Sequence, residues 1–319
     1  MHYRRLGRTG IKLSEISLGA WVTFGAQIDD KTAADLIREA YDAGVNFFDN
    51  ADVYANGRAE EVMGEAIRGL PRETLVISSK VFSPTFAGVN GRGLSRKHIT
   101  ESINASLHRL NLDYVDIYFC HRHDPDTTVE EVVQTMDILV RQGKALYWGT
   151  SEWDVFHLTQ AISFARDNGL IPPAVEQPVY HLMARSRVEN NLAPLCQELG
   201  LGLTTYSPLF HGILSGKYNS GLPEGSRASL EEMGWLRDRI TPRTIDQVKS
   251  LTVIANDLGA TTAQLAIAWL LRRKEVTSVI TGATRVEQLD ENLAAAEIAE
   301  KLDEGTLEAI EVLFPAELQ

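Results

Sequence analysis

The sequence contains very little cysteine. Cys120 and Cys196 are its two thiols in 319 residues, one in an apolar run and one in a helical pattern. So few thiols exclude a disulfide framework as the basis of the fold. We expect both to be buried, as in proteins of a reducing compartment.

Long hydrophobic runs are also missing. No segment approaches the ~20 consecutive apolar residues that a transmembrane helix needs. The basic residues within 1–7 are not followed by the apolar stretch of a signal peptide. We therefore expect a soluble, cytoplasmic protein with no direct membrane insertion.

Positive charge is scarce as well. Lysine and arginine total 31 against 43 aspartates and glutamates, which gives a net charge of −12. No basic run interrupts the acidic background, so nucleic acid is not expected as a partner. His121 and His123 share one turn, but no third ligand follows nearby, so no metal site is expected.

Short β-branched or aromatic runs alternate with amphipathic stretches along almost the whole chain. This alternation is typical of repeated βα units, and eight such units favour a closed (β/α)8 TIM barrel of the α/β class. We expect one domain over residues 1–319. The predicted strands are 16–18, 46–49, 75–80, 115–120, 145–149, 174–177, 202–206 and 278–281.

Local signals mark several boundaries of the repeat. An opening segment rich in glycine and arginine predicts a short N-terminal β-hairpin. Residues 30–43 form an amphipathic helix pattern that Gly44 ends, and Ser95 and Thr128 are suited to cap two later helices. The stretch 210–240 after the seventh strand predicts a long loop, and such loops in compact barrels are usually functional.

Four polar residues stand at or just after the ends of three successive predicted strands. They are Asp49, Tyr54, Lys80 and His121, and loops after barrel strands carry the chemistry in this fold class. A lysine ammonium near Tyr54 favours phenolate and eases proton donation, Asp49 can hold that lysine, and His121 can orient a carbonyl oxygen. The set suits carbonyl reduction. Taken singly, each residue also fits a structural role, as a packing tyrosine, an ion pair or a turn histidine.

Several motifs in a fixed order resemble the aldo-keto reductases. They are GAWVTFG (19–25), FDNADVY (48–54), GLSRKHI (93–99), YWGTS (147–151) and SPL (207–209). The resemblance runs almost end to end. It is nearest to the branch containing the β subunits of voltage-gated potassium channels, because GKY (216–218) followed by SRAS (226–229) also matches that branch.

The resemblance implies a TIM barrel that binds NADPH or NADP+ without a Rossmann domain, so the absence of G-x-G-x-x-G is expected. It implies that Tyr54 is the general acid, that Lys80 and Asp49 tune it, and that His121 orients the carbonyl. The channel subunits have asparagine in place of His121, so this chain departs toward the catalytic pattern. Relatives form tetramers, which implies that this chain can form a homo-oligomer.

The resemblance also implies cofactor contacts along one face of the barrel. Ser151 and Gln177 would bind the carboxamide, Tyr206 would stack on the nicotinamide, and Lys217 and Arg227 would bind the pyrophosphate. The remaining implied contacts are Ala20, Trp21, Gln27, Asp49, Ser207, Pro208, Leu209, Phe210, His211, Gly282, Thr284, Gln288, Glu291 and Asn292, with Arg285 as a further cation.

Two further residues depart from the channel branch. Glu152 stands where that branch has arginine, and Gly225 replaces an aromatic residue of the cofactor loop.

The alternatives to a reductase of small carbonyl substrates are an NADPH-binding regulatory channel subunit and a Schiff-base aldolase that uses Lys80. The aromatic residues expected to line the substrate pocket are Trp21, Phe82, Phe86, Trp153 and Phe210.

Overall fold

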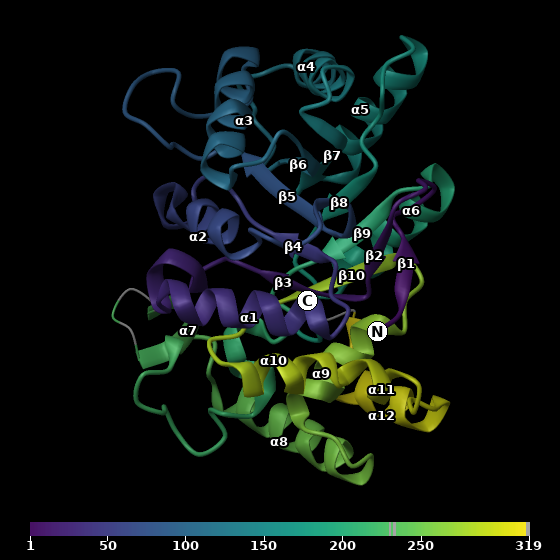
Figure 1. Cartoon of the computed structure of the whole chain (residues 1–319). Coiled ribbons are helices and arrows are strands. Elements are labelled where there is room, and N and C mark those ends of the chain that lie inside the picture. The colour runs from purple at the N-terminus through teal and green to yellow at the C-terminus, as the bar shows by residue number, and fades with distance from the viewer. Residues whose placement is uncertain (230, 232–233, 317–319) are drawn as a thin grey trace.

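Eight short apolar runs form the parallel strands of a closed barrel. In the computed structural model, each strand pairs in parallel with the next, and β10 closes the ring between β9 and β3 (Figure 1). The strands are β3 (Ile16–Gly19), β4 (Phe47–Asp49), β5 (Val76–Val81), β6 (Val115–Cys120), β7 (Ala145–Ser151), β8 (Val175–Gln177), β9 (Gly202–Thr205) and β10 (Val276–Thr281). The predicted TIM barrel is therefore confirmed.

The structure describes residues 1–229, 231 and 234–316. Residues 230, 232 and 233 of the predicted loop 210–240, and residues 317–319 of the predicted domain, lie outside the described residues. Every predicted strand is present, with ends shifted by no more than two residues. The apolar run predicts the buried middle of a strand. The strand's ends depend on where hydrogen bonding to the neighbouring strand stops, which the run itself does not show.

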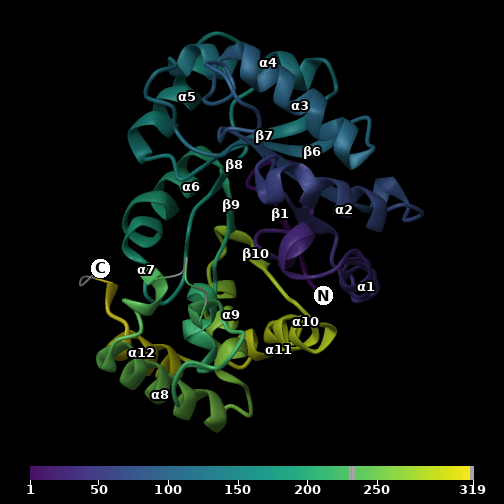
Figure 2. The ribbon, with the colours of Figure 1, turned by 90° about the vertical axis from the view of Figure 1, so that its left-hand side faces the viewer.

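Helices surround the barrel (Figures 1 and 2). The α-helices are α1 (Asp30–Asp42), α2 (Arg58–Ala66), α3 (Arg96–Leu110), α4 (Val129–Arg141), α5 (Val155–Asp167), α6 (Ala193–Leu199), α7 (Gly234–Arg237), α8 (Pro242–Asp257), α9 (Thr262–Leu271), α10 (Val286–Leu293), α11 (Ala295–Ala299) and α12 (Glu304–Leu313). Short 3-10 or π turns cover Thr23–Gln27, Tyr54–Gly57, Arg72–Thr74, Arg187–Leu192, Phe210–Ser215 and Arg227–Ser229. Among the described residues, no helix is long and apolar enough to cross a bilayer.

The predicted capping residues act as expected. Ser95 accepts a hydrogen bond from the backbone N–H of His98, and Thr128 accepts one from that of Glu131. These bonds satisfy amide groups that the first turn of a helix leaves free. Gly44 follows α1 with φ +90°, a conformation that glycine adopts without a Cβ penalty.

The N-terminal hairpin closes the barrel end opposite the strand C-termini. Strands β1 (Tyr3–Arg5) and β2 (Lys12–Ser14) pair in antiparallel fashion. Leu6 and Leu13 pack in one buried cluster with Phe47 and Val76, which begin β4 and β5. The carboxyl ends of the strands are thus the end of the barrel that remains available for a site.

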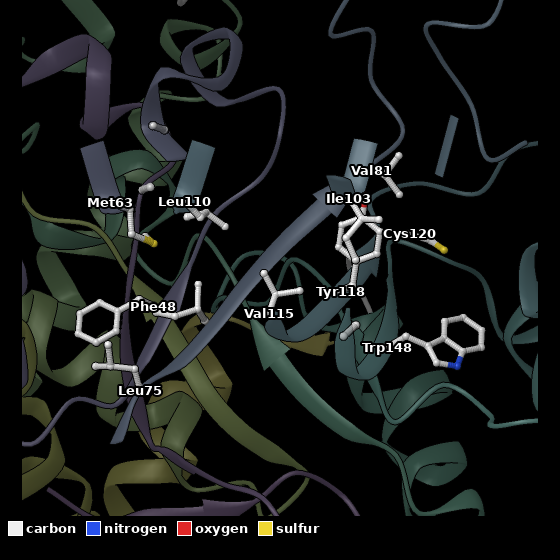
Figure 3. Packing of buried hydrophobic residues seen from close by; sticks show 14 of the residues in the cluster. Phe48, Met63, Leu75, Val81, Ile103, Leu110, Val115, Tyr118, Cys120 and Trp148 are labelled. Atoms are coloured by element: carbon white, nitrogen blue, oxygen red, sulfur yellow. The ribbon is translucent and has the colours of Figure 1, made fainter. Parts of the chain in front are cut away.

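A large apolar cluster fills the layer between the first strands and helices α1–α5 (Figure 3). The members labelled there that lie in strands or just before them are Phe48, Leu75, Val81, Val115, Tyr118, Cys120 and Trp148, and those labelled in helices are Met63, Ile103 and Leu110. Cys120 is fully buried, and Cys196 is buried in a second cluster, so both thiols are free core residues as predicted.

Candidate active site

Three neighbouring strands bring the four predicted polar residues together. Asp49 ends β4, Lys80 is the penultimate residue of β5, and His121 directly follows β6. Tyr54 begins the turn after β4. Because these strands are parallel and adjacent, their carboxyl ends meet at one edge.

Asp49 and Lys80 form a buried ion pair beneath this edge. The Lys80 Nζ lies 2.7 Å from Asp49 Oδ2 and 2.6 Å from the Asn50 carbonyl oxygen. Ser78 Oγ and Gln177 Nε2 also donate to Asp49, at 2.7 and 3.1 Å. A carboxylate with three such donors is held in one orientation, and it fixes the lysine in turn.

Tyr54 and His121 face each other above that pair. Their ring centroids are 5.8 Å apart, and Lys80 Nζ lies 5.0 Å from the Tyr54 ring centroid. Burial, and then the charge of Asp49, raises the pKa of Tyr54 well above its ordinary value. The phenol therefore keeps its proton at neutral pH. This differs from the expected shift toward phenolate, because burial and the charge of Asp49 both favour the neutral phenol.

His121 is neutral in this setting. Burial, and then the charges of Lys80 and Arg122, lowers its pKa well below the ordinary value. Its Nδ1 is buried and has no hydrogen-bond partner among the described residues. A neutral imidazole carries one N–H donor, which is what orienting a carbonyl oxygen requires.

The turn after Tyr54 has an unusual backbone. Ala55, Asn56 and Gly57 all have positive φ angles of 48°, 54° and 90°. A Cβ on Gly57 would lie 2.8 Å from Arg109 Cδ, and Arg109 Nε is held by Glu60 Oε2 at 2.7 Å. Strained turns of this kind persist only where surrounding contacts fix them, and they are frequent at functional sites.

A cavity of about 1070 Å³ opens beside these residues. Asp49, Tyr54 and His121 line it, whereas Lys80 is fully buried below. Its volume is at the upper end of the ~300–1,000 Å³ usual for ligand sites. The described residues contain no group of side chains that could hold a metal ion.

Most residues implied as cofactor contacts line this same cavity. They are Trp21, Gln27, Asp49, Ser151, Gln177, Tyr206, Ser207, Pro208, Leu209, Phe210, His211, Lys217, Arg227, Gly282, Thr284, Gln288, Glu291 and Asn292. Ala20 does not line it. Its side chain is fully buried in the core, between Gly19 and Trp21, which do line the cavity. Arg285 is a further lining residue.

The cavity has a cationic end, formed by Lys217, Arg227 and Arg285. None of the three is among the charges that most affect the pKa of Tyr54. Burial, and then the charges of Arg227 and Arg285, lowers the pKa of Lys217. Burial lowers the pKa of Arg227 as well. Among the described residues, neither Lys217 nor Arg227 has a carboxylate within 4.0 Å. Partly buried cations that repel one another are stabilised by an anion, so this end fits phosphate groups.

The loop after β9 and the start of α10 border this cationic end. Ser207, Phe210 and His211 have positive φ angles of 56°, 43° and 54°, which marks the loop as strained. Thr284 precedes α10, and its backbone N–H and hydroxyl donate to Oε1 of Gln288 within the helix, at 3.0 and 2.9 Å. The predicted loop is thus not structureless, since it contains two 3-10 turns and α7.

Only some of the aromatic residues expected in the substrate pocket lie there. Trp21 and Phe210 line the cavity, but Phe82, Phe86 and Trp153 do not. Trp153 is fully buried in the core, and Phe86 packs edge-on against His98 with ring centroids 5.9 Å apart. The position of an aromatic residue after a strand did not reveal on which side of the loop it packs.

Sequence reasoning missed several lining residues, and three of them carry cationic or aromatic side chains. They are Arg122, His181 and Trp235. Arg122 follows the predicted catalytic His121 directly, and that position was the one signal that could have found it. His181 stacks on Phe210 with ring centroids 4.5 Å apart, a contact between loops of different strands that no local pattern indicates.

Asp52, two residues before Tyr54, gives the free energy of unfolding a pH dependence that can be measured. It is fully buried, Oδ2 accepts from Ser102 Oγ at 2.5 Å, and Oδ1 has no partner among the described residues. Burial raises its pKa from 3.8 to about 7. The folded protein therefore binds this proton up to about pH 7, whereas the unfolded chain releases it near 3.8. The free energy of unfolding should decrease as pH rises across that window.

Asp52→Asn should remove part of this decrease. Between pH 5 and 8 the part removed should be on the order of 1–3 kcal/mol of unfolding free energy, measured by urea denaturation at each pH. Burial also raises the pKa of Glu176 from 4.5 to about 7. Glu176 therefore contributes to the same decrease, and its contribution should remain in the variant. The matched control is Asp113→Asn at an exposed position, which should keep the wild-type slope. An equal slope in Asp52→Asn and wild type would contradict the assignment.

Comparison with known proteins places the chain in a family. The Aldo/keto reductase family matches residues 15–313. A protein named "Probable voltage-gated potassium channel subunit beta" from Arabidopsis thaliana is 49% identical over 317 residues, which cover 98% of this chain and 96% of that protein. A protein of the same name from Oryza sativa subsp. japonica has the same identity and coverage. With its closed eight-stranded barrel, this chain belongs to the aldo/keto reductase family.

Proposed function

We propose that this chain is an NADPH-dependent reductase that converts aldehydes or ketones to alcohols. One observation carries the proposal: a single cavity is lined both by Tyr54 and His121 and by the cations Lys217 and Arg227. The first pair suits proton donation to a carbonyl, and the second suits the phosphates of a dinucleotide. The family match supports an oxidoreductase in general.

The chain's own residues account for the proton in this reaction. Ser151, Gln177 and Tyr206 would hold a nicotinamide, which would supply the hydride for the carbonyl carbon. Tyr54 donates its phenol proton to the carbonyl oxygen, and the neutral His121 holds that oxygen by a hydrogen bond. Lys80 Nζ, 5.0 Å from the tyrosine ring, stabilises the phenolate left behind until it takes a proton from solvent.

The cofactor would extend along the lining residues. Ser151 and Gln177 would bind the carboxamide, and Tyr206 would stack on the nicotinamide ring. Lys217, Arg227 and the loop 207–211 would bind the pyrophosphate. The adenosine end would lie against Gly282, Thr284, Gln288, Glu291 and Asn292. Arg285 supplies a further charge there, which favours NADPH with its additional phosphate over NADH.

Mixing the protein with NADPH and a panel of aldehydes and ketones tests the proposal. We expect the absorbance of reduced cofactor to fall with at least some carbonyls, and the rate with NADH to be lower by about tenfold or more. Absence of consumption with every carbonyl would refute a reductase function. Equal rates with the two cofactors would refute the role given to the cationic end.

A regulatory role is a second candidate because the two similar plant proteins are named as potassium channel β subunits. In that case the chain would bind NADPH and assemble with a membrane channel, as an oligomer. Size-exclusion chromatography with a detergent-solubilised voltage-gated potassium channel would test it. Elution of the two proteins apart, with and without NADPH, would argue against this role.

A further inference from the structure

Arg122 is a cavity cation at the catalytic end. It follows His121 directly, lines the cavity and is half-buried. Its Nη1 donates to the His121 carbonyl oxygen at 2.5 Å and to Ser151 Oγ at 3.4 Å. Across residues 1–229, 231 and 234–316, its Nε and Nη2 have no hydrogen-bond or ion-pair partner. The edge of the guanidinium that carries these two nitrogens is therefore free to bind a ligand.

The charge of Arg122 acts on a different part of the cavity from the other cations. Lys217, Arg227 and Arg285 influence one another, and together they can serve the phosphates of the proposed cofactor. Arg122 instead acts on Tyr54 and His121, and its charge lowers the pKa of both. For Tyr54 this opposes the larger effect of burial, and for His121 it adds to that effect. Its charge thus lies beside the place where the carbonyl would react.

The carboxylates near Arg122 are already bound by other groups. Asp49 holds Lys80 at 2.7 Å. Glu152, which follows β7, accepts from the backbone N–H of Val179 at 2.6 Å and from Arg187 Nη1 at 2.5 Å. Neither comes within 4.0 Å of Arg122. A half-buried guanidinium without a counter-ion has lost part of its hydration, so an anionic ligand group would stabilise it.

We propose that Arg122 selects carbonyl substrates that carry a carboxylate. Building on the reductase function proposed above, the inference adds the substrate class. The Nε and Nη2 edge of a guanidinium offers two parallel N–H donors, which match the two oxygens of a carboxylate. With the carboxylate there, the carbonyl of an oxo acid would reach toward Tyr54 and His121.

Two matched pairs of aldehydes test this specificity. They are 4-carboxybenzaldehyde with its methyl ester, and 4-oxobutanoate with its methyl ester, because each pair differs chiefly in the charge. The wild-type protein should show a kcat/KM for the acid about tenfold or more above that of the ester in at least one pair. Arg122→Gln should bring the ratio close to one, and Arg122→Lys, which keeps the charge without the fork, should retain part of it.

A matched surface variant and two binding measurements complete the test. Arg68→Gln, at a position 64% exposed and paired with Glu65, should keep the wild-type ratio. Benzoate should bind the complex with NADP+ more weakly in Arg122→Gln, in calorimetry. The affinity for NADPH, from its fluorescence, should stay within about threefold, since the cationic end is intact.

Three results would overturn the inference. The first is a wild-type ratio at or below one in both pairs, and the second is an unchanged ratio in Arg122→Gln. The third is a loss of NADPH affinity in Arg122→Gln together with a loss of kcat/KM of the same size for acid and ester. Arg122 would then bind the cofactor and not the substrate. If no aldehyde of either pair or of the wider panel consumed NADPH, the reductase function would fail, and this inference with it.

Discussion

Tyr54→Phe should lower kcat for carbonyl reduction by about 10²–10⁴-fold and leave NADPH binding intact. The magnitude is that of a positioned general acid, since the variant removes the donated proton and keeps the ring. The hydroxyl holds a proton that it can donate, because burial raises the pKa of Tyr54 and keeps the phenol protonated. Stopped-flow measurement of NADPH oxidation gives kcat, and cofactor fluorescence gives the affinity.

Tyr41→Phe is the matched control for this variant. The Tyr41 hydroxyl lies on the surface, 3.1 Å from Thr74 Oγ1, so its loss should not change kcat. If Tyr54→Phe turned over at a rate close to that of the wild type, the proton would come from another group. His121, whose ring faces Tyr54, would be the next candidate.

Lys80→Met should lower the free energy of unfolding by about 3–5 kcal/mol as well as abolish most turnover. The variant leaves the buried Asp49 carboxylate without its counter-ion, and an uncompensated buried charge costs this much. Urea denaturation measures the stability. Adding Asp49→Asn to Lys80→Met should recover part of the stability without the activity, because it removes the stranded charge but does not restore the lysine.

The surface pair of Lys31 and Asp35 supplies the comparison. Both side chains are exposed, so Lys31→Met should change the urea midpoint far less than Lys80→Met. Equal effects of the two substitutions would mean that burial does not determine how much the Asp49–Lys80 pair contributes to stability. Recovery of full turnover in the double variant would mean that the pair has no part in catalysis.

The sequence indicated that the four residues of the proposed catalytic set would come together, because the relevant information is local. Asp49, Lys80 and His121 each stand at or just after the end of an apolar run, and in a parallel barrel all strand ends meet on one face. The helix caps at Ser95 and Thr128 were equally readable, since a cap depends on residues three positions apart.

Pairing and burial between distant segments were decided only by the tertiary structure. The sequence predicted that Lys80 would lie beside Tyr54 and be held by Asp49, but it could not tell that burial, and then the charge of Asp49, would raise the pKa of the phenol. No local pattern indicated that Glu152 would bind Arg187 and leave Arg122 without an ion pair among the described residues, or that Trp153 would be buried in the core. Side-chain periodicity fixes which face of a strand or helix is buried, whereas the partner of a charge or a ring in a loop depends on contacts with other loops.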